Sequence, residues 1–247
     1  SDPMICDSHC HLDLMDNMIS IVQSFEKEDV RILSVGTTPR AYLQEVEMFS
    51  NTKNIHVALG LHPQLVGSGY DDLDLFESLV RQCHYIGEVG LDFSKEYIAN
   101  KEQQIEVFNR VLLCCEQYGS KVVSIHSLKS AATVLKTLSQ LRRNNKNTYI
   151  LHWFTGSLVQ MKNALDIGCF FSINPKMLKT KSGIELIRKI PPNRILLETD
   201  APFSTKFQNI KQLDIILQSM IDDISTLKGI DMKKHIISNE EKVFKYL

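Results

Sequence analysis

The chain has 247 residues, of which 43% are hydrophobic and 23% are charged, a balance typical of a soluble globular protein. Its formal net charge is −1, which argues against a broad basic face for nucleic acid, so any such contact should be local. No apolar run approaches the ~18 residues that suggest a membrane-spanning helix.

The cysteines and the start of the chain bear on its setting. The six cysteines include no Cys-x-x-Cys pair, which argues against a structural zinc ribbon. The start lacks the charged and then apolar regions of a secretory signal, so a cytoplasmic setting without a membrane is expected. Residues 1–3, before Met4, look like a cloning scar, which leaves 4–247 as one predicted domain.

Short apolar runs alternate with helical patterns along the whole chain. In chain order, the expected strand and helix pairs are 4–6 with 15–28, 31–36 with 41–49, 55–61 with 72–83, 85–91 with 102–118, 121–125 with 131–141, 148–151 with 159–165, 169–173 with 183–189, and 195–198 with 210–227. A turn is expected at 142–147 and a short helical tail from residue 240. Such alternation implies parallel strands, and eight units predict an α/β fold, a TIM-type (β/α)₈ barrel.

Two histidines, His9 and His11, follow the first apolar run. Alternate residues of an extended chain point to the same side, so both imidazoles can project into one space. Imidazole is the commonest protein ligand for a metal, and a pair supplies two of the three or more ligands that a catalytic site needs. A single His-x-His is weak evidence, so the interpretation depends on further ligands downstream.

Further ligands do occur at the ends of other predicted strands. Glu88 lies late in the fourth strand, His126 and His152 cap the fifth and sixth, and Asp200 follows the eighth. Barrel enzymes build their active sites at the carboxyl ends of their strands. Four histidines and two carboxylates suffice for two divalent ions that share a bridging carboxylate. The nitrogen and oxygen set suits zinc or manganese and does not exclude magnesium.

Roles for the two carboxylates follow from their charge. Glu88 is the predicted bridge, and Asp200 is the predicted general base, because a carboxylate beside an activated water can take its proton. The six ligands divide into His9, His11 and Asp200 for one ion and Glu88, His126 and His152 for the other. Taken singly, His126 or His152 could equally be a buried histidine with a structural role.

Five more residues are candidates for substrate contact: His62, Asp92, Lys129, Trp153 and Lys176. Three of them have a structural alternative. Asp92 could cap a helix or orient a histidine. An aromatic residue such as Trp153 is more often packing than a stacking platform for a base. Lys176 belongs to a lysine run that is usually a solvated face.

Six segments together resemble the TatD-type metal-dependent deoxyribonucleases of the amidohydrolase-like superfamily. They are Asp-Ser-His-Cys-His-Leu-Asp (7–13), Gly-Leu-His-Pro (60–63), Gly-Glu-Val-Gly-Leu-Asp (87–92), Ile-His-Ser (125–127), His-Trp-Phe-Thr-Gly (152–156) and Glu-Thr-Asp-Ala-Pro (198–202). The resemblance implies a TIM-type barrel, divalent metals on the same six ligands, and hydrolysis of DNA, often as a 3′-to-5′ exonuclease. DNA single strands or ends are the expected substrate.

The chain departs from that family where substrate phosphates would be held. Leu128 stands where many members have arginine, with Lys129 next, and Phe93, Ser94 and Lys95 replace Tyr or Asn and Arg. A hydrolase of an amide or aminoacyl ester therefore stays an alternative.

Two segments, 152–158 and 172–178, look most like QatD, the TatD-like member of bacterial Qat anti-phage systems. That likeness implies a defence role beside an ATPase and a QueC-like protein. A subunit that acts mainly by binding such partners is a further alternative.

Overall fold

The computed structural model describes residues 4–26, 30–141 and 146–245. The predicted scar at 1–3, positions 27 and 28 of the first predicted helix, and most of the predicted turn at 142–147 lie outside these ranges. The chain forms two compact units, which we name by their place in the sequence. The terminal unit comprises residues 1–34, 48–56 and 171–247, and the central unit comprises 35–47 and 57–170.

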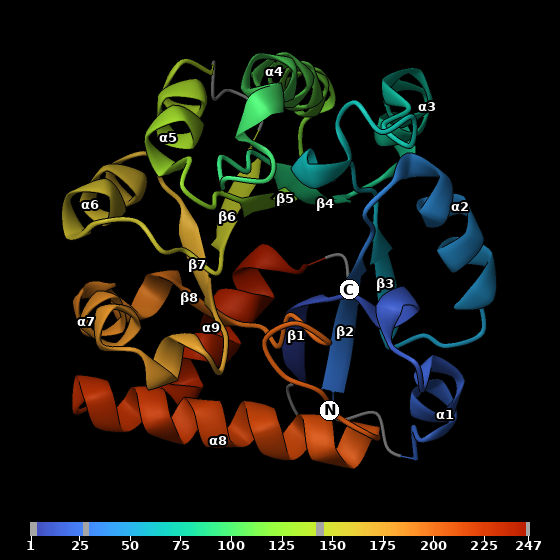
Figure 1. Cartoon of the computed structure of the whole chain (residues 1–247). Helices are drawn as coiled ribbons and strands as arrows, with labels where there is room; N and C mark the ends of the chain where they lie inside the picture. The colour runs from blue at the N-terminus through green and yellow to red at the C-terminus, as the bar shows by residue number, and fades with distance from the viewer. Residues whose placement is uncertain (1–3, 27–29, 142–145, 246–247) are drawn as a thin grey trace. The chain divides into compact units, whose positions relative to one another are not determined.

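The terminal unit contains two pairs of parallel strands. In one pair Ile5 lies opposite Val30, and in the other Phe171 lies opposite Ile195. Helices α7 and α8 pack side by side, and α9 packs against β8 (Figure 1). Its elements are β1 (Ile5–Cys10), α1 (Met18–Gln23), β2 (Val30–Val35), β7 (Phe170–Ile173), α7 (Lys181–Lys189), β8 (Ile195–Leu197), α8 (Ile210–Lys228) and α9 (Lys233–Val243), with β2 and β7 each extending one residue beyond it.

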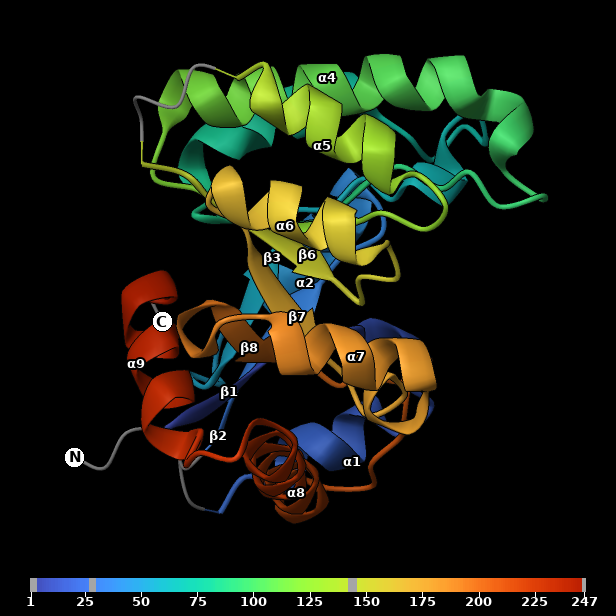
Figure 2. The ribbon, with the colours of Figure 1, turned by 90° about the vertical axis from the view of Figure 1, so that its left-hand side faces the viewer.

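The central unit contains three neighbouring parallel strands. Tyr85 of β4 lies opposite Val122 of β5, which in turn lies opposite Thr148 of β6. The long helix α4 runs beside α5 in both ribbon views (Figures 1 and 2). Its elements are α2 (Pro39–Met48), β3 (Ile55–Ala58), α3 (Leu73–Leu79), β4 (Tyr85–Gly90), α4 (Lys101–Tyr118), β5 (Val122–His126), α5 (Ala131–Ser139), β6 (Thr148–His152) and α6 (Leu158–Asp166); α2 and β3 also reach into the terminal unit.

Helix boundaries follow from local chemistry. Helix α8 buries one apolar stripe, begins where the Asn209 side chain accepts a hydrogen bond from the Gln212 amide at 2.9 Å, and ends at Gly229 in a left-handed conformation. Helix α6 begins with a capping box, in which Ser157 and Gln160 each accept from the other's backbone N–H. No helix in the described ranges has both the length and the apolar run needed to cross a bilayer.

Every predicted strand and helix pair is present, and most boundaries shift by a few residues. Two expectations were wrong. The first strand runs on to Cys10 and contains His9, because the buried polar groups inside it are satisfied; the Ser8 hydroxyl, for example, donates to the Leu197 carbonyl at 2.6 Å. The final helix begins at Lys233 rather than at Glu240, since Ile236 already lies on its buried face.

Candidate functional site

A first cluster of ligand-type side chains lies in the terminal unit. The Nε2 atoms of His9 and His11 each lie 3.4 Å from Oδ1 of Asp200, and all three residues are buried. The backbone sets this arrangement, because the Asp200 amide donates to the His9 carbonyl at 2.8 Å and the His11 amide to the Ala201 carbonyl at 2.9 Å. We call these three residues the terminal cluster.

Asp7 joins the two chain segments that carry the terminal cluster. Its carboxylate accepts from the Thr199 amide at 3.0 Å and from the Thr199 hydroxyl at 2.6 Å. Burial raises the pKa of Asp7 to about 7, and the hydrogen bonds from Thr199 and His9 only partly oppose that rise. Asp7 therefore holds the end of β8 beside β1.

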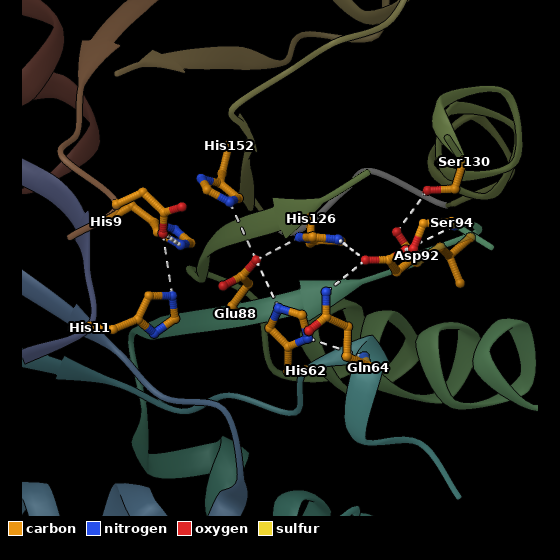
Figure 3. A network of polar contacts seen from close by, with 12 residues as sticks. His9, His11, His62, Gln64, Glu88, Asp92, Ser94, His126, Ser130 and His152 are labelled. Carbon is orange, nitrogen blue, oxygen red and sulfur yellow. Dashed lines mark hydrogen bonds and ion pairs between the residues drawn. The ribbon is translucent and has the colours of Figure 1, made fainter. Parts of the chain in front are cut away.

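A second cluster lies in the central unit, around Glu88 of β4. Three imidazole nitrogens approach its Oε2 atom: Nδ1 of His126 at 2.8 Å, Nε2 of His62 at 3.2 Å and Nε2 of His152 at 3.3 Å. Figure 3 shows the three rings directed at Glu88. His126 and His152 are the last residues of β5 and β6, and His62 precedes a short 3₁₀ turn. We call these four residues the central cluster.

Asp92 orients the His126 ring. Its Oδ2 atom lies 2.8 Å from Nε2 of His126, and its carboxylate also accepts from Gln64 at 2.9 Å and from the Ser94 amide at 2.9 Å (Figure 3). Because a carboxylate can only accept, both nitrogens of His126 carry protons when no ion is bound; with an ion on Nδ1, Nε2 would still donate to Asp92. Such a carboxylate–histidine pair is the usual support of a metal-ligating imidazole.

The charges shift the pKa values of this pair in opposite directions. Burial by itself would raise the pKa of Asp92, but hydrogen bonds from His126, Ser94 and Gln64 outweigh it and hold that pKa below its usual range. Burial would lower the pKa of His126, and the hydrogen bonds to Asp92 and Glu88 outweigh that effect and raise it. The pair is thus tuned toward a carboxylate and a proton-bearing ring.

His62 has a different role from its neighbours in the central cluster. Its Nδ1 atom accepts a hydrogen bond from the Gln64 amide at 3.1 Å. A neutral ring that accepts at Nδ1 carries its proton at Nε2, the atom that faces Glu88. His62 is therefore arranged as a hydrogen-bond donor rather than as a metal ligand.

The donor chemistry of both clusters fits a divalent metal. Each combines imidazole nitrogens with a carboxylate oxygen, the mixed set that suits zinc, manganese and related ions. In the central cluster the ligand atoms of His62, Glu88 and His126 lie close enough to hold one ion by distance alone. Because Nδ1 of His62 accepts a hydrogen bond from Gln64, the Nε2 atom of His62 carries the proton and cannot bind the ion. His152 is therefore a better third ligand than His62.

The other predicted substrate contacts are Lys129, Trp153 and Lys176. Trp153 is half-buried, and its ring meets that of His152 edge-on at 6.3 Å between centroids. Lys129 is exposed in the loop after β5 and has a left-handed backbone conformation (φ 52°), while Lys176 is exposed in the terminal unit. The role of Gln64 was not predicted from the sequence, because a neutral amide gives no sign of supporting a metal site.

Comparisons with known proteins point to one family. The family model described as TatD-related DNase matches residues 6–245. The human deoxyribonuclease TATDN3 is 25% identical, over 94% of this chain and 90% of its own length. The uncharacterized metal-dependent hydrolase YabD of Bacillus subtilis is 27% identical, over 94% of both chains.

A solved structure extends the likeness to the fold. The crystal structure of YjjV, a TatD homolog from Escherichia coli, superposes with a TM-score of 0.80 at 20% identity and covers 98% of both chains. This match confirms the predicted α/β fold of TIM-barrel type. The domain boundary at residue 4 stays a prediction.

Proposed function

The chain belongs to the TatD-related DNase family of metal-dependent hydrolases, and we propose that it is a deoxyribonuclease that cleaves DNA phosphodiester bonds with two divalent ions. The observation that carries this proposal is the central cluster, where three imidazoles converge on one oxygen of Glu88. The ions would be magnesium, manganese or zinc. The expected substrate is single-stranded DNA or DNA ends, because a net charge of −1 gives no broad basic face for a duplex.

Each cluster has a role in this proposal. His9, His11 and Asp200 would hold one ion, and Glu88, His126 and His152 would hold the other; contact of Glu88 with both ions stays a prediction. When bound, the ions supply Lewis-acid activation of water and neutralise charge on the phosphate.

The chain's own residues would handle protons and orientation. Asp200 would take a proton from the attacking water at a carboxylate oxygen. His62 would present its Nε2 proton to a substrate oxygen, since its Nδ1 atom is occupied by the Gln64 amide. Asp92 would keep the His126 tautomer fixed through the 2.8 Å contact at Nε2.

We also propose a cytoplasmic role in bacterial defence against phage, alongside other Qat-system proteins. The support is the likeness of segments 152–158 and 172–178 to QatD. A phage-plating assay with Asp200→Asn examines this role. Protection that survives the substitution would favour a subunit that acts by binding partners over one that acts by cleavage.

The decisive experiment pairs metal analysis with cleavage of labelled single- and double-stranded DNA. Wild-type protein should hold about two metals per chain, and Glu88→Ala should lower cleavage by on the order of 100-fold or more, because it removes the carboxylate at the centre of the cluster. Glu185→Ala, which removes an exposed carboxylate on α7, is the matched control and should change neither quantity.

Other results would redirect the proposal. Metal-loaded protein that cleaves no DNA but turns over an ester or amide would establish the alternative hydrolase. Protein that takes up no metal even after reconstitution would contradict the proposed ligand set.

A further inference from the structure

A cavity of about 470 Å³ lies in the central unit, next to residues of the central cluster. Ser127, which directly follows His126, forms part of its wall, and so does Phe93, which follows Asp92. The rest of the wall comes mainly from the β5–α5 loop, the first turn of α5 and the loop before α6. None of these groups is needed to hold a metal, and only Lys129 among them is a predicted substrate contact.

The charge of the cavity favours an anion. Lys101 and Lys129 line it, and none of its described lining residues is acidic. The Lys101 ammonium lies 5.2 Å from the centre of the Phe93 ring, a cation–π contact at one wall. The amino end of α5 adds roughly half a positive charge.

The amino end of α5 also has backbone donors to offer. The first N–H groups of a helix have no acceptor within the helix. Ser130, the residue before α5, makes no capping hydrogen bond; its hydroxyl instead donates to the Leu91 carbonyl at 2.7 Å. The capping box at α6 shows the contrast, because there the Ser157 side chain already accepts from one such donor, the Gln160 amide. An oxyanion in the cavity could take up the donors of α5.

A buried hydroxyl points to a ligand at the same place. Ser127 is 5% exposed, and within the described part of the chain its Oγ atom has no hydrogen-bond partner. A buried polar atom left without a partner is destabilising, and such atoms are rare in native proteins. A bound oxyanion would satisfy this hydroxyl.

We propose that this cavity binds a terminal phosphate monoester of the nucleic-acid substrate. The dianion of a monoester matches two lysines and a helix end better than the single charge of an internal phosphodiester. Ser127, Lys129 and the first turn of α5 would bind its oxygens, and Lys101 would supply the second charge. The inference rests on the proposed function only in naming DNA as the carrier of the phosphate.

The test measures binding without cleavage. Short fluorescent oligodeoxythymidylates with uncleavable phosphorothioate linkages would carry a 5′-phosphate, a 3′-phosphate or neither, and fluorescence anisotropy would give each Kd for the metal-loaded protein. One phosphorylated form should bind about tenfold more tightly than the unphosphorylated one. Ser127→Ala and Lys129→Gln should each remove most of that difference.

Lys162→Gln is the matched control, because Lys162 is exposed on α6 of the same unit but does not line the cavity. It should preserve the end preference. Equal affinity for all three oligonucleotides, or a preference that survives Lys129→Gln in a folded protein, would overturn the inference. Inorganic phosphate serves as the competitor. Weak competition supports a site that requires a DNA end. Full competition at equal concentration indicates a site for free phosphate and contradicts the inference.

The two proposals can fail separately. Phosphate recognition without DNA cleavage would contradict the nuclease function and leave the cavity assignment intact. Cleavage of DNA without any preference for a phosphorylated end would support the nuclease function and contradict the cavity assignment.

Discussion

At the scale of single residues, His126 is the most constrained side chain of the candidate site. Glu88 lies at one ring nitrogen and Asp92 at the other, each at 2.8 Å. Because Asp92 is itself fixed by Gln64 and Ser94, the ring has little freedom to rotate or change tautomer. Sequence alone suggested that Asp92 caps a helix or orients a histidine, and the contact with His126 favours the second role.

Asp92→Asn should weaken metal binding. The amide can still accept the Nε2 proton, but the loss of its charge makes the imidazole a poorer ligand, so metal affinity should fall by about 10- to 100-fold. Titration against a metal-sensitive chelator measures the affinity. Ser94→Ala is the milder control, since it removes one donor to Asp92 and leaves the charge. Unchanged affinity in a folded Asp92→Asn protein would show that Asp92 does not support a ligand.

At the scale of elements, glycines allow the ends of β2, β3 and β4 to approach closely. The Gly36 amide donates to the Gly87 carbonyl at 3.1 Å, and the Glu88 amide donates to the Gly36 carbonyl at 2.9 Å. A Cβ atom on Gly60 would lie 1.9 Å from the Gly36 carbonyl oxygen. The position of Glu88 therefore depends on Gly60, which follows β3 and has no side chain.

Gly60→Ala should lower the free energy of unfolding by about 3 kcal/mol or more, because the methyl group meets backbone atoms that cannot move independently. Urea denaturation followed by circular dichroism measures the change. Gly36→Ala is the matched control: its Cβ would have 3.4 Å to the nearest atom, so a small effect is expected. A wild-type midpoint for Gly60→Ala would contradict the close approach of these strands.

At the scale of the whole molecule, a buried acid makes stability depend on pH. Glu240 of α9 accepts a hydrogen bond from the Cys6 amide of β1 at 2.7 Å. Burial raises its pKa to about 8 from 4.5, against the opposing effect of the Cys6 hydrogen bond. Between these two values the folded chain keeps a proton that the unfolded chain has lost, so stability falls as pH rises from about 4.5 to about 8.

Glu240→Gln should remove the part of this decline that Glu240 contributes, since glutamine is never charged and its carbonyl oxygen can still accept from Cys6. Asp7, whose pKa burial raises to about 7, keeps its own part. The variant should be more stable than wild type by a few kcal/mol at pH 8 and nearly equal to it at pH 5, because each pKa unit corresponds to about 1.4 kcal/mol. Denaturant midpoints across this range measure it. The exposed neighbour substitution Glu241→Gln should leave the wild-type profile, and identical profiles for both variants would refute the role of Glu240.

The limits of prediction from sequence also differ by scale. The alternation of strands and helices was readable because apolar periodicity is local. The start of α9 was not, because its first turn is polar and only contact with the rest of the terminal unit shows that Ile236 is buried. The candidate ligands could be named from residue type and position at strand ends, but their supporting groups could not.

The sequence by itself determined the βα order, the family, and which residues could bind a metal, because periodicity and residue type are properties of short segments. Only the tertiary structure decided that Nε2 of His62 bears the proton, that Glu88 and Asp92 face the two nitrogens of His126, and that Ser127 is buried in a cavity wall beside two lysines. These features depend on partners far apart in the chain: Gln64 reaches Asp92 across 28 positions, and Asp92 reaches His126 across 34. Protonation and hydrogen bonding are set by such neighbours, which exist only once the chain has folded.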